Sequence, residues 1–450
     1  MKYLPNCGEE LQKMLETIGV DNIEELFRSI PEELRLTKPL NLPEPKSEME
    51  VLAGLKHIAS KNKTASDSAF FLGAGAYNHY IPTVVSSLIS RAEFYTAYTP
   101  YQPELSQGTL QALFEYQTMI SQLTEMEVAN SSLYDGASAT AEAVLMTDRI
   151  QRKKNKVIVS DGLHPEYIET LETYLHNLPL EVVKVSLTDK EGETDLDALE
   201  GAVDEETAAV LVQSPNFFGV IEPLDAVSEI CKKSGALFVT TVAEIYSLGL
   251  LRGPGAFDAD IVVGEAQSLG NRMNYGGPYL GFIASRDKYK RQLPGRLVGM
   301  TEDNRGQRGF VITLATREQH IRREKATSNI CTNEALCATM AAIHMAALGE
   351  EGVREVADTC YSKAEYAKDK LVSIDKVSLV YSGSSFNEFT IDIGKSGIDV
   401  IESLAEKNII AGFPLVYHYP DRENQILVTF TEMNSKADID NFAKELEGVL

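Results

Sequence analysis

The chain has 450 residues and a formal net charge of −24, so it is long enough to bury large cores and to divide into two or three domains. Its acidic excess would repel phosphate backbones and anionic lipid surfaces, which makes nucleic acid and membranes poor candidate partners. The first residues lack the apolar stretch of a signal peptide, and no run of about 18 uncharged apolar residues follows. We therefore expect a cytoplasmic protein.

The cysteines give no sign of a disulfide framework. They form no CxxC pair and have no histidine at zinc-finger spacing. Buried, reduced thiols are therefore expected rather than disulfides or a metal site. The five are Cys7, Cys231, Cys331, Cys337 and Cys360.

Residues 1–65 are expected to form an N-terminal helical arm. Short amphipathic segments, LQKMLETIG and NIEELFRSI, precede the proline-rich connector KPLNLPEPK. Proline-rich composition of this kind is typical of a linker.

Residues 66–316 are expected to form a large α/β domain. Apolar strand-like runs such as VIVS, AAVLVQ, ALFVTTV and ADIVVG alternate with helical patterns such as EYIETLETYL and LDAVSEICKKS. This alternation predicts a mostly parallel sheet covered by helices on both faces. Residues 317–450 then read as a long helical stretch and a small C-terminal α+β domain.

The segment EFYTAYTPYQPELSQG carries a row of tyrosines. Pro100 and Pro103 favour an extended path, on which every third residue falls on one face. Tyr95, Tyr98, Tyr101 and Glu104 have that spacing. The row could line a polar pocket or pack against a neighbouring chain, and both readings hold if the pocket lies between chains.

Two glycine-containing segments could approach a ligand. In NSSLYDGASATAEAVLM, residues Gly136, Ala137 and Ser138 stand where a loop enters a helix, so backbone N–H groups could hold a phosphate there. An ordinary capped helix explains the same pattern equally well. The run FLGAGAYN lacks the third glycine of a dinucleotide fingerprint, so nucleotide binding there is disfavoured.

Several other polar residues have ordinary explanations. His164 follows a strand near the expected ligand-binding edge of the sheet, and a structural cap is the usual role of such a histidine. Asn216 follows a strand and is expected to make a turn. A basic run is read as a solvated loop in preference to a docking patch for an acidic partner. It comprises Arg305, Arg308, Arg317, Arg322 and Arg323.

Six segments together resemble one enzyme family. They are LGAGAYNHYIPTVV, RAEFYTAYTPYQPELSQGTLQALFEYQTMI, MEVANSSLYDGASATAEA, SDGLHPE, ADIVVGEAQSLGNRMNYGGPYLGF and REKATSNICTNEALCA. The family is the P-protein of the glycine cleavage system, in particular its alpha-subunit members. The resemblance implies a fold-type I pyridoxal-phosphate-dependent transferase-like fold, with a large mostly parallel-sheet domain and a small C-terminal α+β domain. It also implies decarboxylation of glycine and transfer of an aminomethyl group to the lipoyl group of H-protein.

The two residues that anchor pyridoxal phosphate in such an enzyme are missing. By the resemblance, Thr241 stands in place of the acid that contacts the pyridine nitrogen, and Ser268 stands in place of the lysine that bonds to the cofactor. No shift of register restores the lysine, because the interval from Ser234 to Asp287 contains none. The cofactor is therefore expected on a partner, the P-protein beta subunit, and not on this chain.

The resemblance assigns the remaining site residues to two groups. Tyr95, Thr96, Tyr98, Tyr101 and Glu104 are implied to lie close to a site shared by the alpha and beta subunits. A vestigial pocket is implied at Gly136, Ala137, Ser138, His164, Thr241 and Ser268. The alternative is a non-catalytic scaffold that stabilises the beta subunit and offers a docking surface to H-protein.

Overall fold

The computed structural model describes residues 6–36, 38–330 and 334–450. The chain separates into two compact units, residues 1–62 and residues 63–450. The expected domain limits at residues 65 and 316 stay predictions. No helix in the described ranges has the length and apolar composition needed to cross a membrane.

The first unit is helical, as its sequence predicts. Helix α1 (Glu9–Ile18) ends at Gly19, whose positive φ of 82° closes the last turn. The second amphipathic segment forms a short 3-10 helix, Ile23–Phe27. Helix α2 (Glu48–Ala59) was missed by our reading, although Ser47 and Glu50 form the capping box that begins it.

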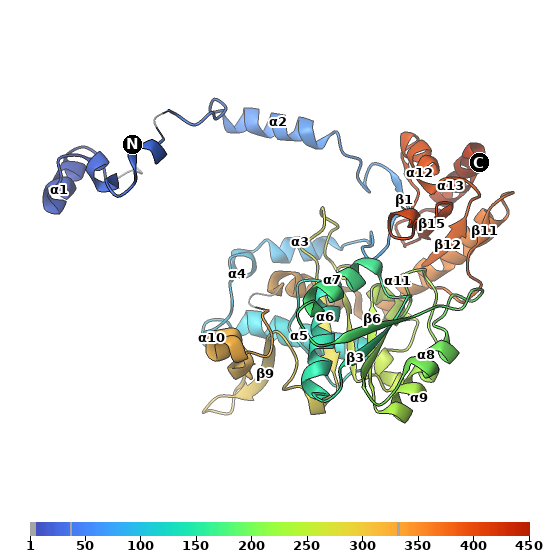
Figure 1. Cartoon of the computed structure of the whole chain (residues 1–450). Coiled ribbons are helices and arrows are strands. Elements are labelled where there is room, and N and C mark those ends of the chain that lie inside the picture. The colour runs from blue at the N-terminus through green and yellow to red at the C-terminus, as the bar shows by residue number, and fades with distance from the viewer. Residues whose placement is uncertain (1–5, 37, 331–333) are drawn as a thin grey trace. The chain divides into compact units, whose positions relative to one another are not determined.

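The second unit is built on a seven-stranded sheet with the order β2-β8-β7-β6-β5-β3-β4. Neighbouring strands from β4 to β7 are parallel, and β8 and β2 add two antiparallel pairs at one edge. The predicted, mostly parallel sheet is therefore confirmed (Figure 1). The strands are β2 (Val128–Ala129), β3 (Lys156–Ser160), β4 (Glu181–Val185), β5 (Thr207–Gln213), β6 (Leu237–Val242), β7 (Ile261–Glu265) and β8 (Gly281–Ser285).

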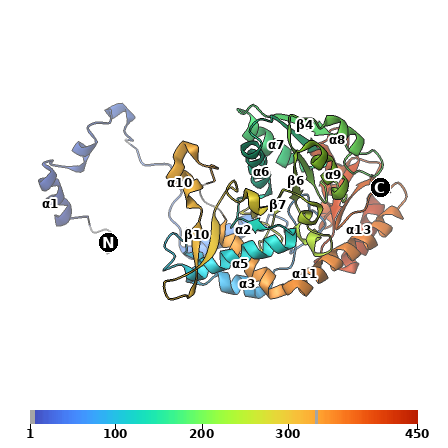
Figure 2. The same ribbon diagram turned by 90° about the horizontal axis from the view of Figure 1, so that it is seen from below.

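Helices cover both faces of this sheet, which explains why its central strands are continuously apolar. Along β5, Ala209 and Leu211 pack with helices α6 (Gly136–Ile150) and α7 (Pro165–Leu175). Val210 and Val212 face the opposite layer. That layer contains α5 (Gln107–Thr124), α8 (Leu196–Ala202), α9 (Leu224–Ser234) and part of α11 (Ala335–Val372). Figure 2 shows α5 running beside α11.

Helix α11 leads from this layer into a smaller C-terminal part. Gly349, with φ 66° and ψ −179°, interrupts the helix. A four-stranded antiparallel sheet follows in the order β11-β12-β15-β14. Its elements are β11 (Ser378–Leu379), β12 (Glu388–Asp392), β14 (Phe413–Pro414) and β15 (Gln425–Thr429), together with helices α12 (Gly397–Glu406) and α13 (Lys436–Val449). Strand β1 (Ala69–Phe70) pairs with β13 (Ile409–Ile410) and so belongs to this part.

Between the sheet and α11 the chain forms a hairpin that the sequence analysis did not predict. Strands β9 (Leu297–Glu302) and β10 (Arg308–Thr313) pair antiparallel and pack on α5. Short helices α3 (Thr83–Ile89), α4 (Ala92–Tyr95) and α10 (Gln319–Arg322) complete the unit.

Of the four described cysteines, all but one are buried as expected. Cys231, Cys337 and Cys360 are buried and free, whereas Cys7 is exposed. Cys331 lies outside the described residues.

Candidate functional site

The tyrosine segment lies between helices α4 and α5. Tyr95 is the last residue of α4, residues 97–102 form neither helix nor strand, and a turn follows at residues 103–105. The expected extended path does not run through the whole segment, and the Tyr101 N–H donates to the Thr99 carbonyl at 2.8 Å in its middle. Tyr95 departs from it because Pro100 restricts only the residue directly before it.

The tyrosine side chains point largely into solvent. Tyr95, Tyr98 and Tyr101 are 58%, 73% and 55% exposed. Thr96 and Glu104 are also exposed, and the Thr96 hydroxyl donates to the Ala92 carbonyl. Rings exposed to this degree are typical of surfaces that tyrosine buries against a partner.

A cavity of about 180 Å³ lies beside this segment. Tyr98, Thr99, Arg296 and Glu334 are among its lining residues, so a phenol, a hydroxyl, a guanidinium and a carboxyl border one space. The volume is below that of pockets for drug-sized ligands. Most of its other lining residues are apolar, among them Leu113, Val298 and Ile312.

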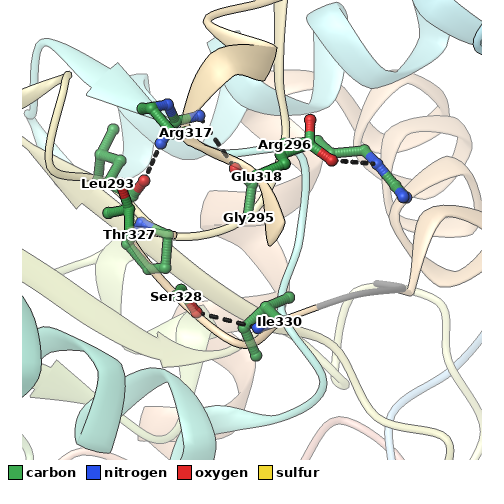
Figure 3. A pocket seen from close by; sticks show the side chains of 9 residues that line it. Leu293, Gly295, Arg296, Arg317, Glu318, Thr327, Ser328 and Ile330 are labelled. Carbon is green, nitrogen blue, oxygen red and sulfur yellow. Dashed lines mark hydrogen bonds and ion pairs between the residues drawn. The ribbon is translucent and has the colours of Figure 1, made fainter. Parts of the chain in front are cut away.

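Arg296 connects the cavity to the tyrosine segment, and our reading of the sequence missed it. Its Nη2 atom donates to the Tyr101 hydroxyl at 3.3 Å, and its guanidinium carbon lies 5.5 Å from the centre of that ring. Its Nε atom lies 3.5 Å from Glu318 Oε2 (Figure 3). A single arginine after a Pro-Gly turn forms no pattern in the sequence, so no signal marked it.

Arg317 corrects the expectation of a solvated basic loop. It is buried and donates to the carbonyls of Leu293 and Gly295 (Figure 3), the second at 3.1 Å. It also donates to the Leu314 carbonyl at 3.1 Å. The loop reading fails here because this guanidinium satisfies main-chain acceptors inside the protein. The other four arginines of the run are exposed.

The N-terminus of α6 was the candidate phosphate site. Asp135 caps this helix, with its carboxylate accepting from the Ser138 N–H at 2.7 Å. The Gly136 N–H donates to Glu265 Oε2 at 3.0 Å. A Cβ atom at Gly136 would lie 2.3 Å from the Tyr167 hydroxyl, so only glycine fits there. Gly136 and Ser138, two of the three predicted cup residues, thus already donate to carboxylates of this chain.

Glu265 is the central residue of this arrangement, and sequence reasoning missed it too. It ends strand β7 and is almost completely buried. Its second oxygen, Oε1, accepts from the N–H groups of Gln267 at 2.9 Å and Leu280 at 2.8 Å. Burial raises the pKa of this carboxyl to about 7, against the lowering effect of those N–H donors. A glutamate ending an apolar strand is the only hint that the sequence offers.

His164 is a structural cap in this fold. His164 is the N-cap of α7, and its Nδ1 atom accepts from the Glu166 N–H in the first turn at 3.2 Å. Its Nε2 atom lies 2.9 Å from the Ala74 carbonyl oxygen. The ring stacks on Tyr167 with centroids 4.8 Å apart. Burial lowers the pKa of His164 to about 4, which keeps the ring neutral as these contacts require.

The two positions that the resemblance aligns with cofactor anchors make local hydrogen bonds. Thr241 lies near the end of β6, with its hydroxyl 3.5 Å from that of Thr140. Ser268 donates to Glu244 Oε2 at 3.3 Å. Neither hydroxyl can protonate a pyridine nitrogen or form an imine.

These residues do not fit pyridoxal phosphate. Carboxylates of the chain take the N–H groups expected for the phosphate, and a serine stands where the covalent bond would form. The backbone beside Ser268 is also engaged within the chain. The Gln267 side chain hydrogen-bonds to both the N–H and the carbonyl of Tyr77, at 3.0 and 3.2 Å. Tyr167 lies against two of the predicted pocket residues, since its ring stacks on His164 and its hydroxyl borders Gly136.

Asn216 makes the turn that its position predicts. Its Oδ1 atom accepts from the N–H groups of Phe218 and Val220, both at 3.1 Å. Its Nδ2 atom donates to Glu222 at 2.8 Å.

Comparison with protein families gives one match over nearly the whole chain. A family described as "Glycine cleavage system P-protein" matches residues 1–446. The chain is 49% identical to the probable glycine dehydrogenase (decarboxylating) subunit 1 of Moorella thermoacetica, over 100% of both chains. It is 50% identical to the protein of the same name in Halalkalibacterium halodurans, over 99% of this chain and 98% of that one.

Solved structures agree in fold. The glycine decarboxylase (P-protein) of the glycine cleavage system, in inhibitor-bound form, matches with a TM-score of 0.90 and 44% identity over 100% of both chains. The sphingosine-1-phosphate lyase of Burkholderia pseudomallei shares the fold with a TM-score of 0.66 and 14% identity, over 92% of this chain and 93% of that one. The expected fold-type I class is confirmed.

Proposed function

The chain belongs to the glycine cleavage system P-protein family, and on that premise we propose that it is the non-cofactor-bearing alpha subunit (subunit 1) of a two-chain glycine dehydrogenase (decarboxylating). The beta subunit carries pyridoxal phosphate and the lysine that binds it. The two chains together act on glycine and on the lipoyl group of H-protein, in the cytoplasm. The subunit designation of the relatives supports a partner chain.

One observation carries this assignment of roles. The Glu265 carboxylate accepts the Gly136 N–H at 3.0 Å, where a cofactor phosphate would be held. Ser268, which stands in place of the lysine, donates a hydrogen bond to Glu244. A chain whose own candidate cofactor groups are hydrogen-bonded internally can still complete a neighbour's site, because its surface side chains remain available.

The surface contribution is the tyrosine segment. In this proposal Tyr95, Thr96, Tyr98, Tyr101 and Glu104 lie at the subunit interface and border the entrance of glycine and the lipoyl arm. Their exposure supports it, since none of the five is buried in this chain. Closing such an entrance against a partner excludes water from the reacting groups.

Borohydride trapping tests which chain holds the cofactor. The two subunits are co-expressed, treated with borohydride in the presence of pyridoxal phosphate, digested and mapped by mass spectrometry. We expect the pyridoxyl-lysine peptide only from the beta subunit. A pyridoxyl-lysine peptide from this chain at comparable yield contradicts the proposal.

A scaffold without catalytic side chains is the second candidate function. The same exposed tyrosines favour it if their role is only to bury area against the beta subunit. Conservative tyrosine substitutions separate the two functions, because a phenol hydroxyl matters to turnover only when it contacts substrate or a reacting group.

A further inference from the structure

Three side chains with metal-ligating atoms meet inside residues 63–450, outside the site described above. They are His79, Cys360 and Glu432, and their ligand atoms all lie within 4.8 Å of one another. His79 follows β1, Cys360 belongs to the second half of α11, and Glu432 lies between β15 and α13. The proposed function gives this cluster no role.

We propose that His79, Cys360 and Glu432 bind one Zn²⁺ ion, with water as the fourth ligand. An imidazole nitrogen, a thiolate and a carboxylate oxygen are the three donor types that zinc takes in proteins. His79 and Cys360 are buried, whereas 16% of the Glu432 side chain is exposed. The open position for water therefore lies on the glutamate side.

The S···O separation in the cluster matches that of a tetrahedral zinc site, whereas the N···O separation is shorter. Zinc bond lengths of about 2.3 Å to sulfur and about 2.0 Å to nitrogen and oxygen set an S···O separation of about 3.5 Å and an N···O separation of about 3.3 Å. Cys360 Sγ lies 3.5 Å from Glu432 Oε2. His79 Nδ1 lies 2.7 Å from the same oxygen, so the ring has to move back by about 0.6 Å to admit the ion.

The surrounding contacts are those of a supported metal ligand. His79 Nε2, the nitrogen facing away from the cluster, lies 3.0 Å from the buried Glu244 Oε2. A carboxylate in this place fixes the orientation of a zinc-bound imidazole and raises its basicity. The other oxygen of Glu432 accepts the Tyr80 N–H at 2.6 Å, which leaves Oε2 directed at the cluster.

The donor set supplies the charge that zinc requires. A thiolate at Cys360 and a carboxylate at Glu432 together bring two negative charges to a Zn²⁺ ion. An ion pair alone makes little use of the thiol, because sulfur is a weak donor, whereas zinc binds all three atoms.

Such an ion would link three segments that are far apart in the sequence, and Glu244 would connect it to Ser268. Glu244 accepts hydrogen bonds from both His79 and Ser268, at 3.0 and 3.3 Å. Spacing rules for cysteine pairs could not find this site, since its ligands are far apart in the sequence.

Metal content tests the proposal on the full-length chain. The protein is loaded with Zn²⁺, dialysed against metal-free buffer and analysed by plasma mass spectrometry. We expect one zinc ion per chain in the wild type and in the control Cys231→Ser, which alters a buried cysteine elsewhere. Cys360→Ser and His79→Asn lose the ion, and Glu244→Gln binds it about tenfold to 100-fold more weakly.

Cobalt substitution gives a readout that needs no variant. In wild-type protein loaded with Co²⁺ we expect a thiolate-to-cobalt charge-transfer band and the intense ligand-field bands of tetrahedral cobalt. A spectrum without the thiolate band overturns the proposal. Zinc retained by folded Cys360→Ser at the wild-type level overturns it too.

Discussion

The Glu265 carboxylate accepts a hydrogen bond from the backbone N–H of Gly136, at 3.0 Å. The same side chain accepts two more from Gln267 and Leu280, so one buried residue ties the start of α6 to the end of β7 and the start of β8. The candidate phosphate site is therefore an internal connection between the sheet and helix α6 in this chain.

Glu265→Ala is expected to destabilise the chain by about 3 kcal/mol or more, because it leaves three buried N–H groups without their acceptor. Acetate fits the vacated space and restores those acceptors, so it raises the Tm of the variant but not of the wild type. Differential scanning calorimetry with acetate, and with chloride as the control anion, measures both effects. Equal responses of the two proteins to acetate would contradict this account of the pocket.

Because His164 has a lowered pKa, the free energy of unfolding is expected to fall in acid. Burial lowers its pKa to about 4 in the folded chain, from an ordinary value of 6.5. Between these values the unfolded chain binds a proton that the folded chain does not. The free energy of unfolding therefore falls as the pH falls from 6.5 to 4, by about 3 kcal/mol in total from this residue.

His164→Asn isolates this contribution, since asparagine also caps a helix N-terminus but does not titrate. Urea unfolding of both proteins across this pH range gives the comparison. We expect the difference between wild type and variant to shrink or reverse toward pH 4. Parallel curves would mean that His164 takes up no proton in this range.

The sequence predicted the seven-stranded sheet well and the short strands of both sheets poorly. Strands β5 and β7 are buried on both faces, so each is a continuous apolar run that can be recognised without a partner. Strands β2 and β14 have two residues each, too few for any periodicity. The hairpin of β9 and β10 was missed because its outer half is exposed and polar.

Some residues of the candidate site could likewise be identified from the sequence, and others could not. Thr241 and Ser268 could be recognised as misfits because the resemblance supplied the expected residues at those positions. Glu265 and Arg296 could not, since each acts through partners distant in the sequence, such as Gly136 for the first and Tyr101 for the second. Contacts of this kind exist only once the fold has formed.

Tyr95→Phe and Tyr98→Phe are expected to lower the turnover of the reconstituted alpha–beta complex while leaving assembly intact. Losing one hydroxyl hydrogen bond of about 0.5–1.5 kcal/mol corresponds to a decrease of about twofold to tenfold. Steady-state kinetics with glycine and lipoylated H-protein, together with size-exclusion chromatography, measure the two properties. Tyr417→Phe removes another exposed phenol and serves as the control, with unchanged turnover. Unchanged kinetics in both test variants would favour the scaffold.

Arg296 and Glu318 are expected to depend on each other for stability. Their side chains are 9% and 11% exposed, and Nε lies 3.5 Å from Oε2. Arg296→Met leaves a carboxylate with little access to water and without its main counter-charge, so we expect a loss of about 3 kcal/mol. Adding Glu318→Met removes that carboxylate, which in the single variant keeps only its contact with His320 Nδ1 at 3.6 Å among its ion pairs, and the double variant should recover most of the loss.

A double-mutant cycle measured by urea unfolding gives this coupling directly. The cycle also separates stability from function, because Arg296 donates to Tyr101 and borders the cavity beside Tyr98. The double variant restores the fold but not the guanidinium, so the complex should regain stability and still show a higher KM for glycine. Additive effects of the two substitutions would mean that the pair contributes no interaction energy. A normal KM in the double variant would show that the Arg296 guanidinium plays no part in binding glycine.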